Sequence, residues 1–331
     1  MIGAPATLAW EARPPSAHQV RLARATLGLL FGVTLFYPLI LGIALPLAAW
    51  YWPLATGALI AMALSSLWWA RRASVTVKSR VLDAWRSYFS LRVWREDAPW
   101  SSPSLLNGPV LFVAVPHGLF PMVLPLLSRS PYPDMVSTSV YPELANRPGG
   151  IAGVASVFFW IPFLAPLVTW LGGVPATRST LQGLLRDNHY CMLFPDGIAG
   201  AFGAIDSTGK SDVLRIAKRE TSVLSLAHGG GGGSANTATT IVPVYCFGHT
   251  QLWRWSWPPA GHWLERLSRR VRMAFIWYWP LIPQGRIDVV FGAPLDGAPA
   301  HTGSISAAIA ALYARHAERL GYGHRDLRIV E

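Results

Sequence analysis

A long stretch without charge dominates the N-terminal part of the chain. Residues 27–70 contain no Asp, Glu, Lys or Arg, and one transmembrane helix needs only about 20 apolar residues. Aromatic residues at 50–52 interrupt the stretch between Pro46 and Pro53, and arginines flank both of its ends. Because basic residues mark cytoplasmic ends, this pattern predicts a transmembrane or re-entrant helical hairpin that enters the membrane and returns. The alternative is a single bent, buried helix, and the absence of charge over the whole stretch argues against it.

The composition indicates the same environment. Charged residues make up 14% of the chain and hydrophobic residues 52%, whereas a soluble domain has about 25% charged residues. The formal net charge is +11, but no Lys/Arg-rich run is interleaved with aromatic residues as in nucleic-acid-binding proteins. The basic residues cluster beside apolar stretches, so we expect membrane lipids as partners and no nucleic acid. Cys191 and Cys246 lie far apart in apolar segments, which indicates a reducing compartment, with neither a disulfide framework nor a metal site.

Four segments follow from these patterns. Residues 1–26 show little periodicity and predict a loose N-terminal tail, before the hairpin of residues 27–70. Residues 71–109 predict an interfacial amphipathic helix and a linker. In residues 110–331 short apolar runs alternate with helical or loop segments, which predicts an α/β domain with a mainly parallel sheet sandwiched by helices. The expected strands are Leu111–Val115, Met135–Ser139, Cys191–Phe194, Thr240–Tyr245 and Ile287–Phe291.

Several segments of this domain have a composition of their own. Residues 151–173 are again free of charge. A third membrane span there would place the flanking residues on opposite sides, so we prefer a Pro-broken helical segment that lines an apolar groove. Residues 251–263 and 277–279 are dense in Trp and predict a second interfacial patch. Residues 304–320 predict a closing amphipathic helix.

One histidine stands at the end of the first expected strand of the domain. Pro116 ends the apolar run before it, and Gly118 after it lets the backbone turn without a Cβ clash. The imidazole of His117 at such an edge is suited to take a proton from a hydroxyl group near neutral pH. The alternative is a histidine whose ring bonds to a local backbone carbonyl.

Four short motifs follow one another at strand or loop ends. They are Val115-Pro116-His117-Gly118, Gly173-Val174-Pro175-Ala176-Thr177-Arg178, Phe194-Pro195-Asp196-Gly197 and Val242-Pro243-Val244-Tyr245-Cys246-Phe247-Gly248. In this order the series resembles the type-2 diacylglycerol acyltransferase family, within the glycerolipid acyltransferase superfamily. The first motif is similar to His-Pro-His-Gly, the second to Gly-Leu-x-Pro-x-Ser-Arg and the fourth to Val-Pro-Val-Tyr-x-Phe-Gly. The third is closer to the Phe-Pro-Glu-Gly of lysophospholipid acyltransferases. The resemblance covers roughly residues 27–323.

The resemblance implies an acyl-CoA-dependent O-acyltransferase that esterifies diacylglycerol to triacylglycerol. It implies acyl-CoA as co-substrate, no cofactor, and an endoplasmic reticulum membrane location with a cytoplasmic catalytic domain; the lipid droplet is the alternative location. His117 is then the general base, and the backbone N–H of Gly118 a donor to the oxyanion. Other acceptors stay open, namely monoacylglycerol, a wax alcohol, phytol or a lysophospholipid. A non-catalytic lipid-droplet scaffold and a homo-oligomer also stay open.

Departures from the family pattern concern the carboxylates. The resemblance places an acidic residue at Gly200, so Asp196 is expected to act in its stead as a catalytic residue that receives an acceptor hydroxyl or orients a base. The alternative is a simple Asp-Gly turn. The superfamily's aspartate five positions after the histidine is Met122 here, and His249 stands where the family more often has Glu. The guanidinium fork of Arg178 suits a phosphate or an acceptor oxygen, with a surface arginine as the alternative. Residues expected to bind substrate are Pro116, Phe120, Arg178, Phe194, Pro195, Gly197 and Pro243.

Overall fold

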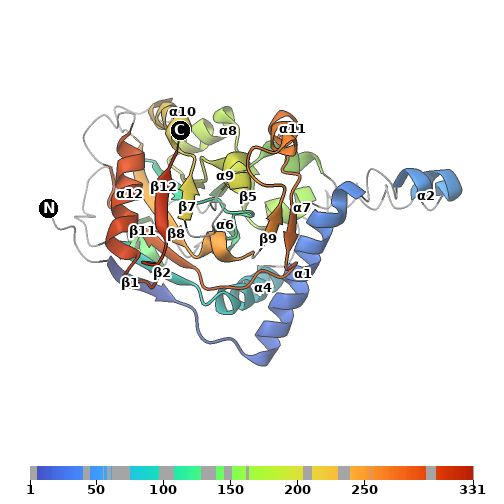
Figure 1. Ribbon diagram of the computed structural model, residues 1–331, viewed down its shortest axis with the longest axis horizontal. Helices are drawn as coiled ribbons and strands as arrows, with labels where there is room; N and C mark the ends of the chain where they lie inside the picture. The colour runs from blue at the N-terminus through green and yellow to red at the C-terminus, as the bar shows by residue number, and fades with distance from the viewer. Residues whose placement is uncertain are drawn as a thin grey trace.

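An eight-stranded sheet forms the centre of the computed structural model (Figure 1). The structure describes residues 6–39, 45–54, 56–57, 61, 75–96, 108–127, 139–144, 151–161, 164–203, 211–229, 239–253, 255–295 and 303–330. The strands are β1 (Ala6–Glu11), β2 (Arg92–Glu96), β3 (Val110–Val115), β4 (Ile151–Val154), β5 (Gly173–Pro175), β6 (Tyr190–Leu193), β8 (Thr240–Phe247) and β11 (Asp288–Phe291). They lie in the order β1-β2-β11-β8-β3-β6-β4-β5. The pairs β1–β2 and β11–β8 are antiparallel and the other neighbouring pairs are parallel, so the predicted mainly parallel sheet is confirmed.

Helices and two small sheets surround this sheet. The α-helices are α1 (Ala17–Leu39), α2 (Leu45–Tyr51), α4 (Val75–Tyr88), α6 (Val123–Leu127), α7 (Leu164–Trp170), α8 (Arg178–Arg186), α9 (Gly197–Gly203), α10 (Ala217–Gly229), α11 (Trp263–Val271) and α12 (Ser304–His316). The short 3-10 helices are η4 (Pro142–Leu144), η5 (Ser156–Trp160) and η6 (His249–Gln251). The small sheets pair β9 (Trp255–Trp257) with β10 (Trp277–Trp279), antiparallel, and β7 (Ser211–Leu214) with β12 (Asp326–Ile329), parallel.

Both faces of the sheet are buried, which is why its central strands read as continuous apolar runs. Along β3 the side chains alternate between two apolar clusters. Phe112 and Ala114 belong to the cluster that contains buried residues of α1 and α4, whereas Leu111 and Val113 belong to the cluster with buried residues of α8, α10 and α12. The sheet is therefore sandwiched by helices, as expected from the sequence.

The apolar runs predicted four of the described strands to within two residues, namely β3, β6, β8 and β11. Most of the predicted strand Met135–Ser139 lies outside the described residues. The helical prediction for residues 151–173 is wrong at both ends, where β4 and β5 pair in parallel. These two strands have four and three residues, which is too short for a periodic pattern.

The predicted loose tail is also wrong, because its residues have distant partners. β1 pairs with β2 in a register that joins Ala6 to Glu96, and such a long-range pairing leaves no local periodicity. α1 then begins at Ala17, within the segment expected to be loose.

The first arm of the predicted hairpin lies against the protein. Ala23, Leu27 and Phe31 on α1 are fully buried in the core beside α4, while Leu29 is 69% exposed. Among the residues that the structure describes, no helix is both long and apolar enough to cross a membrane. Much of the second arm lies outside the described residues, so the hairpin stays a prediction.

The two predicted amphipathic helices turn their apolar sides to the core. On α4, Leu82 and Trp85 are buried, and on α12 Ile305 and Ile309 are buried. The membrane contact predicted for α4 stays a prediction.

Candidate active site

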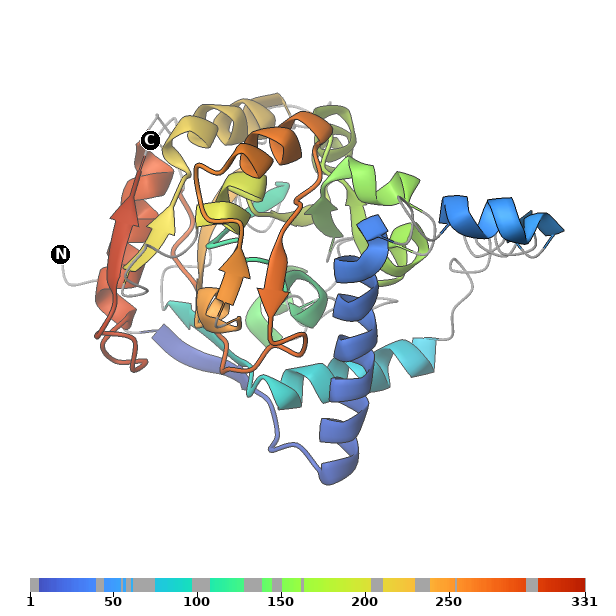
Figure 2. The ribbon, with the colours of Figure 1, turned by 45° about the vertical axis from the view of Figure 1, so that its right-hand side comes forward.

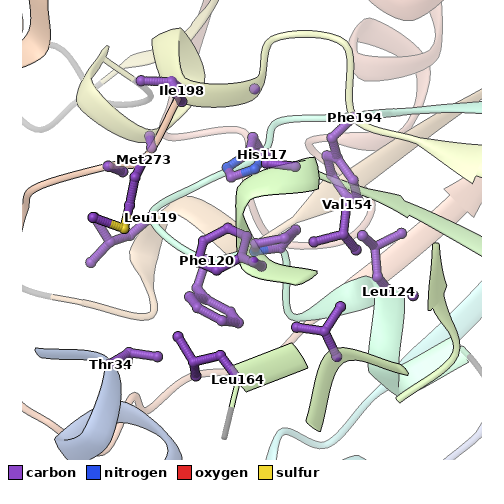
Figure 3. Close-up of a pocket in the computed structure, with 18 of the residues that line it drawn as sticks. Thr34, His117, Leu119, Phe120, Leu124, Val154, Leu164, Phe194, Ile198 and Met273 are labelled. Carbon is purple, nitrogen blue, oxygen red and sulfur yellow. The ribbon is translucent and has the colours of Figure 1, made fainter. Parts of the chain in front are cut away.

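An apolar cavity of about 290 Å³ lies beside the C-terminal end of β3. Its wall combines α1, the loop after β3, the segment from β4 to α7, the loop between β6 and α9, and residues 272–276 and 278. Figure 3 shows His117 at this wall, with Ile198 and Met273 on one side and Phe194 on the other. Parallel sheets commonly bind ligands at the carboxyl ends of their strands, and the cavity has this position. The segment from residue 151 to 173 contributes to the wall, as the predicted apolar groove requires.

The imidazole of His117 is oriented by its own loop. Nδ1 lies 2.8 Å from the carbonyl oxygen of Gly118. A carbonyl can only accept, so Nδ1 carries the proton and the lone pair of Nε2 is free to accept another. The bond to Gly118 is the local backbone contact considered as the alternative for this residue, yet it also gives the ring the tautomer that a general base requires. Gly118 itself has a φ of +62°, a conformation that favours glycine.

The side chain of Asp196 contacts the backbone of the same loop. Its side chain is buried, and Oδ2 accepts the backbone N–H of His117 at 2.9 Å. Burial raises the pKa of Asp196, while the nearby His117 and its backbone N–H act in the opposite direction. Within the described part of the chain Oδ1 is buried and has no hydrogen-bond partner, and the cavity wall does not include Asp196. Asp196 therefore holds the loop that carries His117. Its predicted roles, receiving an acceptor hydroxyl or orienting a base, stay predictions.

Gly200 leaves the space that the carboxylate of Asp196 occupies. A Cβ added at Gly200 would overlap Oδ2 of Asp196 and lie 2.6 Å from its Cγ and 3.0 Å from the Cβ of His117. The two positions are one helical turn apart and face the same point. The acidic residue expected at Gly200 and the acidic residue present at Asp196 are thus alternatives for one volume below the histidine.

His249 is a second buried residue that holds the loop, a role that sequence reasoning missed. It is fully buried on η6, where Nδ1 donates to the carbonyl of Pro116 at 2.9 Å and Nε2 accepts the N–H of Met122 at 3.0 Å. Burial lowers the pKa of His249 to about 4, so the ring is neutral, as these two bonds require. Its ring also lies 3.3 Å from the Cβ position of Gly118. A signal for this role is its position directly after the Val-Pro-Val-Tyr motif, at the end of β8.

The residues expected to bind substrate divide into three groups. Phe120, Phe194 and Gly197 line the cavity. Pro116 and Pro195 flank wall residues without belonging to the wall themselves. Arg178 and Pro243 lie away from the wall.

Arg178 and Pro243 are not brought to the cavity. Arg178 is exposed at the start of α8 and donates to the hydroxyl of Ser225 at 2.7 Å. Its contact with a phosphate or an acceptor oxygen stays a prediction. Pro243 is buried within β8, where its carbonyl accepts the N–H of Gly292 at 2.9 Å. It has a structural role because it lies in the sheet.

Sequence reasoning also missed the polar contacts between α1 and β10. Tyr278 donates to the carbonyl of Phe31 at 2.8 Å, and its hydroxyl lies 2.8 Å from that of Thr34. Thr34, Phe31 and Tyr278 all line the cavity. These contacts join segments more than 240 residues apart, and no local sequence motif predicts them.

The chain is similar to known proteins in sequence and in structure. The family model for diacylglycerol acyltransferase matches residues 58–319. Acyl-CoA wax alcohol acyltransferase 2 from Mus musculus is 27% identical over 153 residues, which are 42% of this chain and 43% of the mouse protein. The match thus spans less than half the length of that relative. Among solved structures, the 1-acyl-sn-glycerophosphate (LPA) acyltransferase PlsC from Thermotoga maritima aligns with a TM-score of 0.40 and 16% identity over 92% of this chain and 98% of that chain.

Proposed function

The chain belongs to the diacylglycerol acyltransferase family, and from that premise we propose that it transfers an acyl group from acyl-CoA to the hydroxyl of a neutral lipid, with His117 as general base. One observation carries the proposal. The imidazole of His117 stands at the wall of an apolar cavity with its proton fixed on Nδ1. An imidazole that presents Nε2 to an oily cavity suits a reaction whose two substrates are lipids.

The chemistry needs few protein groups. Nε2 of His117 accepts the proton of the acceptor hydroxyl while the oxygen attacks the thioester carbonyl carbon. The resulting oxyanion needs a nearby donor, for which we propose the backbone N–H of Gly118. When the tetrahedral intermediate collapses, the carbon–sulfur bond breaks and the CoA sulfur takes the proton back from the imidazolium. The products are the ester and CoA, and the histidine returns to its starting state without a covalent enzyme intermediate.

We propose diacylglycerol as the acceptor, with triacylglycerol as product. The family model supports this choice. A long-chain alcohol is the second candidate, supported by the relative whose printed name specifies wax alcohol. Both are uncharged and fit a wall whose polar side chains in the described residues are Thr34, His117, Arg272 and Tyr278. The proposal includes no cofactor, and places the enzyme at the endoplasmic reticulum membrane or the lipid droplet with its catalytic domain in the cytoplasm.

A panel of acceptors tests the proposal. Membranes from cells that express the chain receive labelled acyl-CoA with diacylglycerol, monoacylglycerol, a long-chain alcohol, phytol or a lysophospholipid. We expect labelled triacylglycerol as the main product. A wax ester as main product would favour the second candidate, and no product with any acceptor would indicate a non-catalytic scaffold.

The role of His117 has its own test. We expect His117→Ala to lose activity by at least about 100-fold, because a general base contributes about 10²–10⁴-fold. Ser179→Ala is the matched control, since Ser179 is exposed and lies outside the cavity wall. Activity retained in His117→Ala would exclude this residue as the base.

A further inference from the structure

Tryptophans crowd one face of the hairpin formed by β9 and β10. In its antiparallel register Trp255 lies opposite Trp279, and Trp257 opposite Trp277. Alternation along a strand places these four side chains on one face, where they are 40–62% exposed. The opposite face is bound to the domain through Tyr278, which is buried and bonds to α1.

Helix α11 adds a second apolar strip. Trp263, Leu267 and Val271 recur every four residues and are 58%, 39% and 42% exposed. Side chains at this spacing lie on one face of a helix. Glu265 and Ser268 on the other side are buried. The helix is thus amphipathic in an unusual sense, because its polar residues face inward and its apolar strip faces outward.

The hairpin and the helix form one continuous surface. The ring of His262 lies 5.1 Å from that of Trp257 and 5.7 Å from that of Trp263, so it bridges the two. Figures 1 and 2 show α11 at one end of the hairpin. We call Trp255, Trp257, Trp279, Trp263, Leu267 and Val271 the docking surface.

The exposed charged side chains on and directly after α11 have one sign. Arg266, Arg269, Arg270 and Arg272 are exposed on or directly after α11. The acidic residue of the helix, Glu265, is buried and paired with Arg269 and Arg215. Contiguous exposed apolar side chains mark sites of interaction with proteins or membranes. Exposed tryptophans with flanking arginines are typical of helices and hairpins that lie in the interface of an anionic membrane.

The docking surface adjoins the cavity. The chain from Arg272 to Ile276, which joins α11 to β10, lines the cavity, and so does Tyr278 on the inner face of the hairpin. A bilayer in contact with the docking surface would lie against this wall, so that lipids could reach His117 without crossing water.

We propose that α11 and the β9–β10 hairpin dock on an anionic phospholipid leaflet. This surface is separate from the charge-free N-terminal stretch. The inference does not depend on acyl transfer, because the binding of vesicles can be measured without turnover.

Two pairs of variants test whether the arginines of α11 contribute to the binding of anionic vesicles. Arg266→Ala with Arg270→Ala removes two charges from α11, and Arg186→Ala with Arg219→Ala removes two exposed charges from α8 and α10. We measure binding of the full chain to phosphatidylcholine vesicles with and without phosphatidylserine. At about fivefold per arginine, the α11 pair should bind the anionic vesicles about 25-fold more weakly, and the control pair less than about threefold. Equal losses in both pairs would overturn the proposal.

A label tests the contact directly. Both natural cysteines are buried, so a polarity-sensitive dye attaches selectively to Trp257→Cys, or to Ser222→Cys on the exposed side of α10 as control. We expect a shift to an apolar environment on adding anionic vesicles at position 257 only. A shift at both positions, at neither, or at position 257 on raising protein concentration without vesicles would contradict membrane docking. His117→Ala should bind vesicles like the unaltered chain, so loss of activity and loss of docking are distinguishable.

Discussion

Replacing Asp196 separates two roles that a buried carboxylate beside a histidine can have. Its Oδ2 accepts the backbone N–H of His117, whereas the ring bonds to the carbonyl of Gly118. The carboxylate therefore holds the loop and does not exchange a proton with the imidazole. We expect Asp196→Asn, whose amide oxygen can still accept the bond, to keep most of the activity, and Asp196→Ala to lose it.

The structure sets the size of this effect. A hydrogen bond to a charged group contributes about 1.5–3 kcal/mol and one between neutral groups about 0.5–1.5 kcal/mol. At about 1.4 kcal/mol per tenfold change, Asp196→Ala should lower kcat/KM by roughly 10- to 150-fold, and Asp196→Asn by less than about tenfold. The assay is acyl transfer in detergent with labelled acyl-CoA, with thermal unfolding of each variant as the check on folding. Equal losses in the two variants would refute positioning and assign the carboxylate to proton transfer.

Gly200 offers an independent perturbation of the same contact. Its Cβ would lie 2.6 Å from Cγ of Asp196, and overpacking of this kind costs about 1–3 kcal/mol. In an Asp196→Gly background the obstructing carboxylate is gone and only the 3.0 Å approach to the Cβ of His117 remains, so Gly200→Ala should then cost less than it does beside Asp196. A coupling of at least about 1 kcal/mol in this double-mutant cycle is the expected result; additive effects would show that the two positions do not share one volume.

Three further predictions concern pH and the cavity. Burial lowers the pKa of His249 to about 4, below its unfolded value of about 6.5, so the unfolded chain binds the proton first as the pH falls. The free energy of unfolding should therefore fall by up to about 3 kcal/mol between about pH 6.5 and 4. Urea unfolding measures this fall, and His249→Gln should not show it. Burial raises the pKa of Asp196, so between about pH 4 and that raised pKa the folded state keeps a proton that the unfolded chain has lost. The free energy of unfolding should therefore fall as the pH rises through this range. Asp196→Asn should lack this fall. Leu164 lines the cavity, and Figure 3 shows it away from His117. Leu164→Phe should therefore lower the rate ratio of long to short acyl-CoA about tenfold, and an unchanged ratio would place the acyl chain elsewhere.

The sequence predicted what depends on local pattern. The apolar run before Pro116 gave both the strand β3 and the place of His117 at its end. Because parallel strands end at one edge of the sheet, the motif at Phe194 also reached the site. The motif around Pro243 contributes to the site in a different way, since the strand that carries it is followed by His249.

The errors arise where distant partners decide the structure. The charge-free stretch from residue 27 predicts a membrane hairpin, which stays a prediction, but Leu27 and Phe31 near its start are covered by protein. The sequence alone does not show whether protein or lipid covers an apolar helix face. The expectation for Asp196 left two roles open, a contact with an acceptor hydroxyl or the orientation of a base, and its catalytic role stays a prediction. Residue type and motif position indicate that a carboxylate lies near the histidine, but only the backbone trace shows that it meets the N–H and not the ring.

The contacts around the catalytic loop explain how a histidine without a carboxylate partner keeps a fixed orientation. Asp196 binds the N–H of His117, His249 binds the carbonyl of Pro116 and the N–H of Met122, and the ring closes on the carbonyl of Gly118. A carboxylate placed directly on the imidazole would bring a charge to the apolar cavity, where desolvation is costly. The two buried side chains instead hold the backbone of the loop from outside the cavity wall, while the ring of His117 stands at that wall.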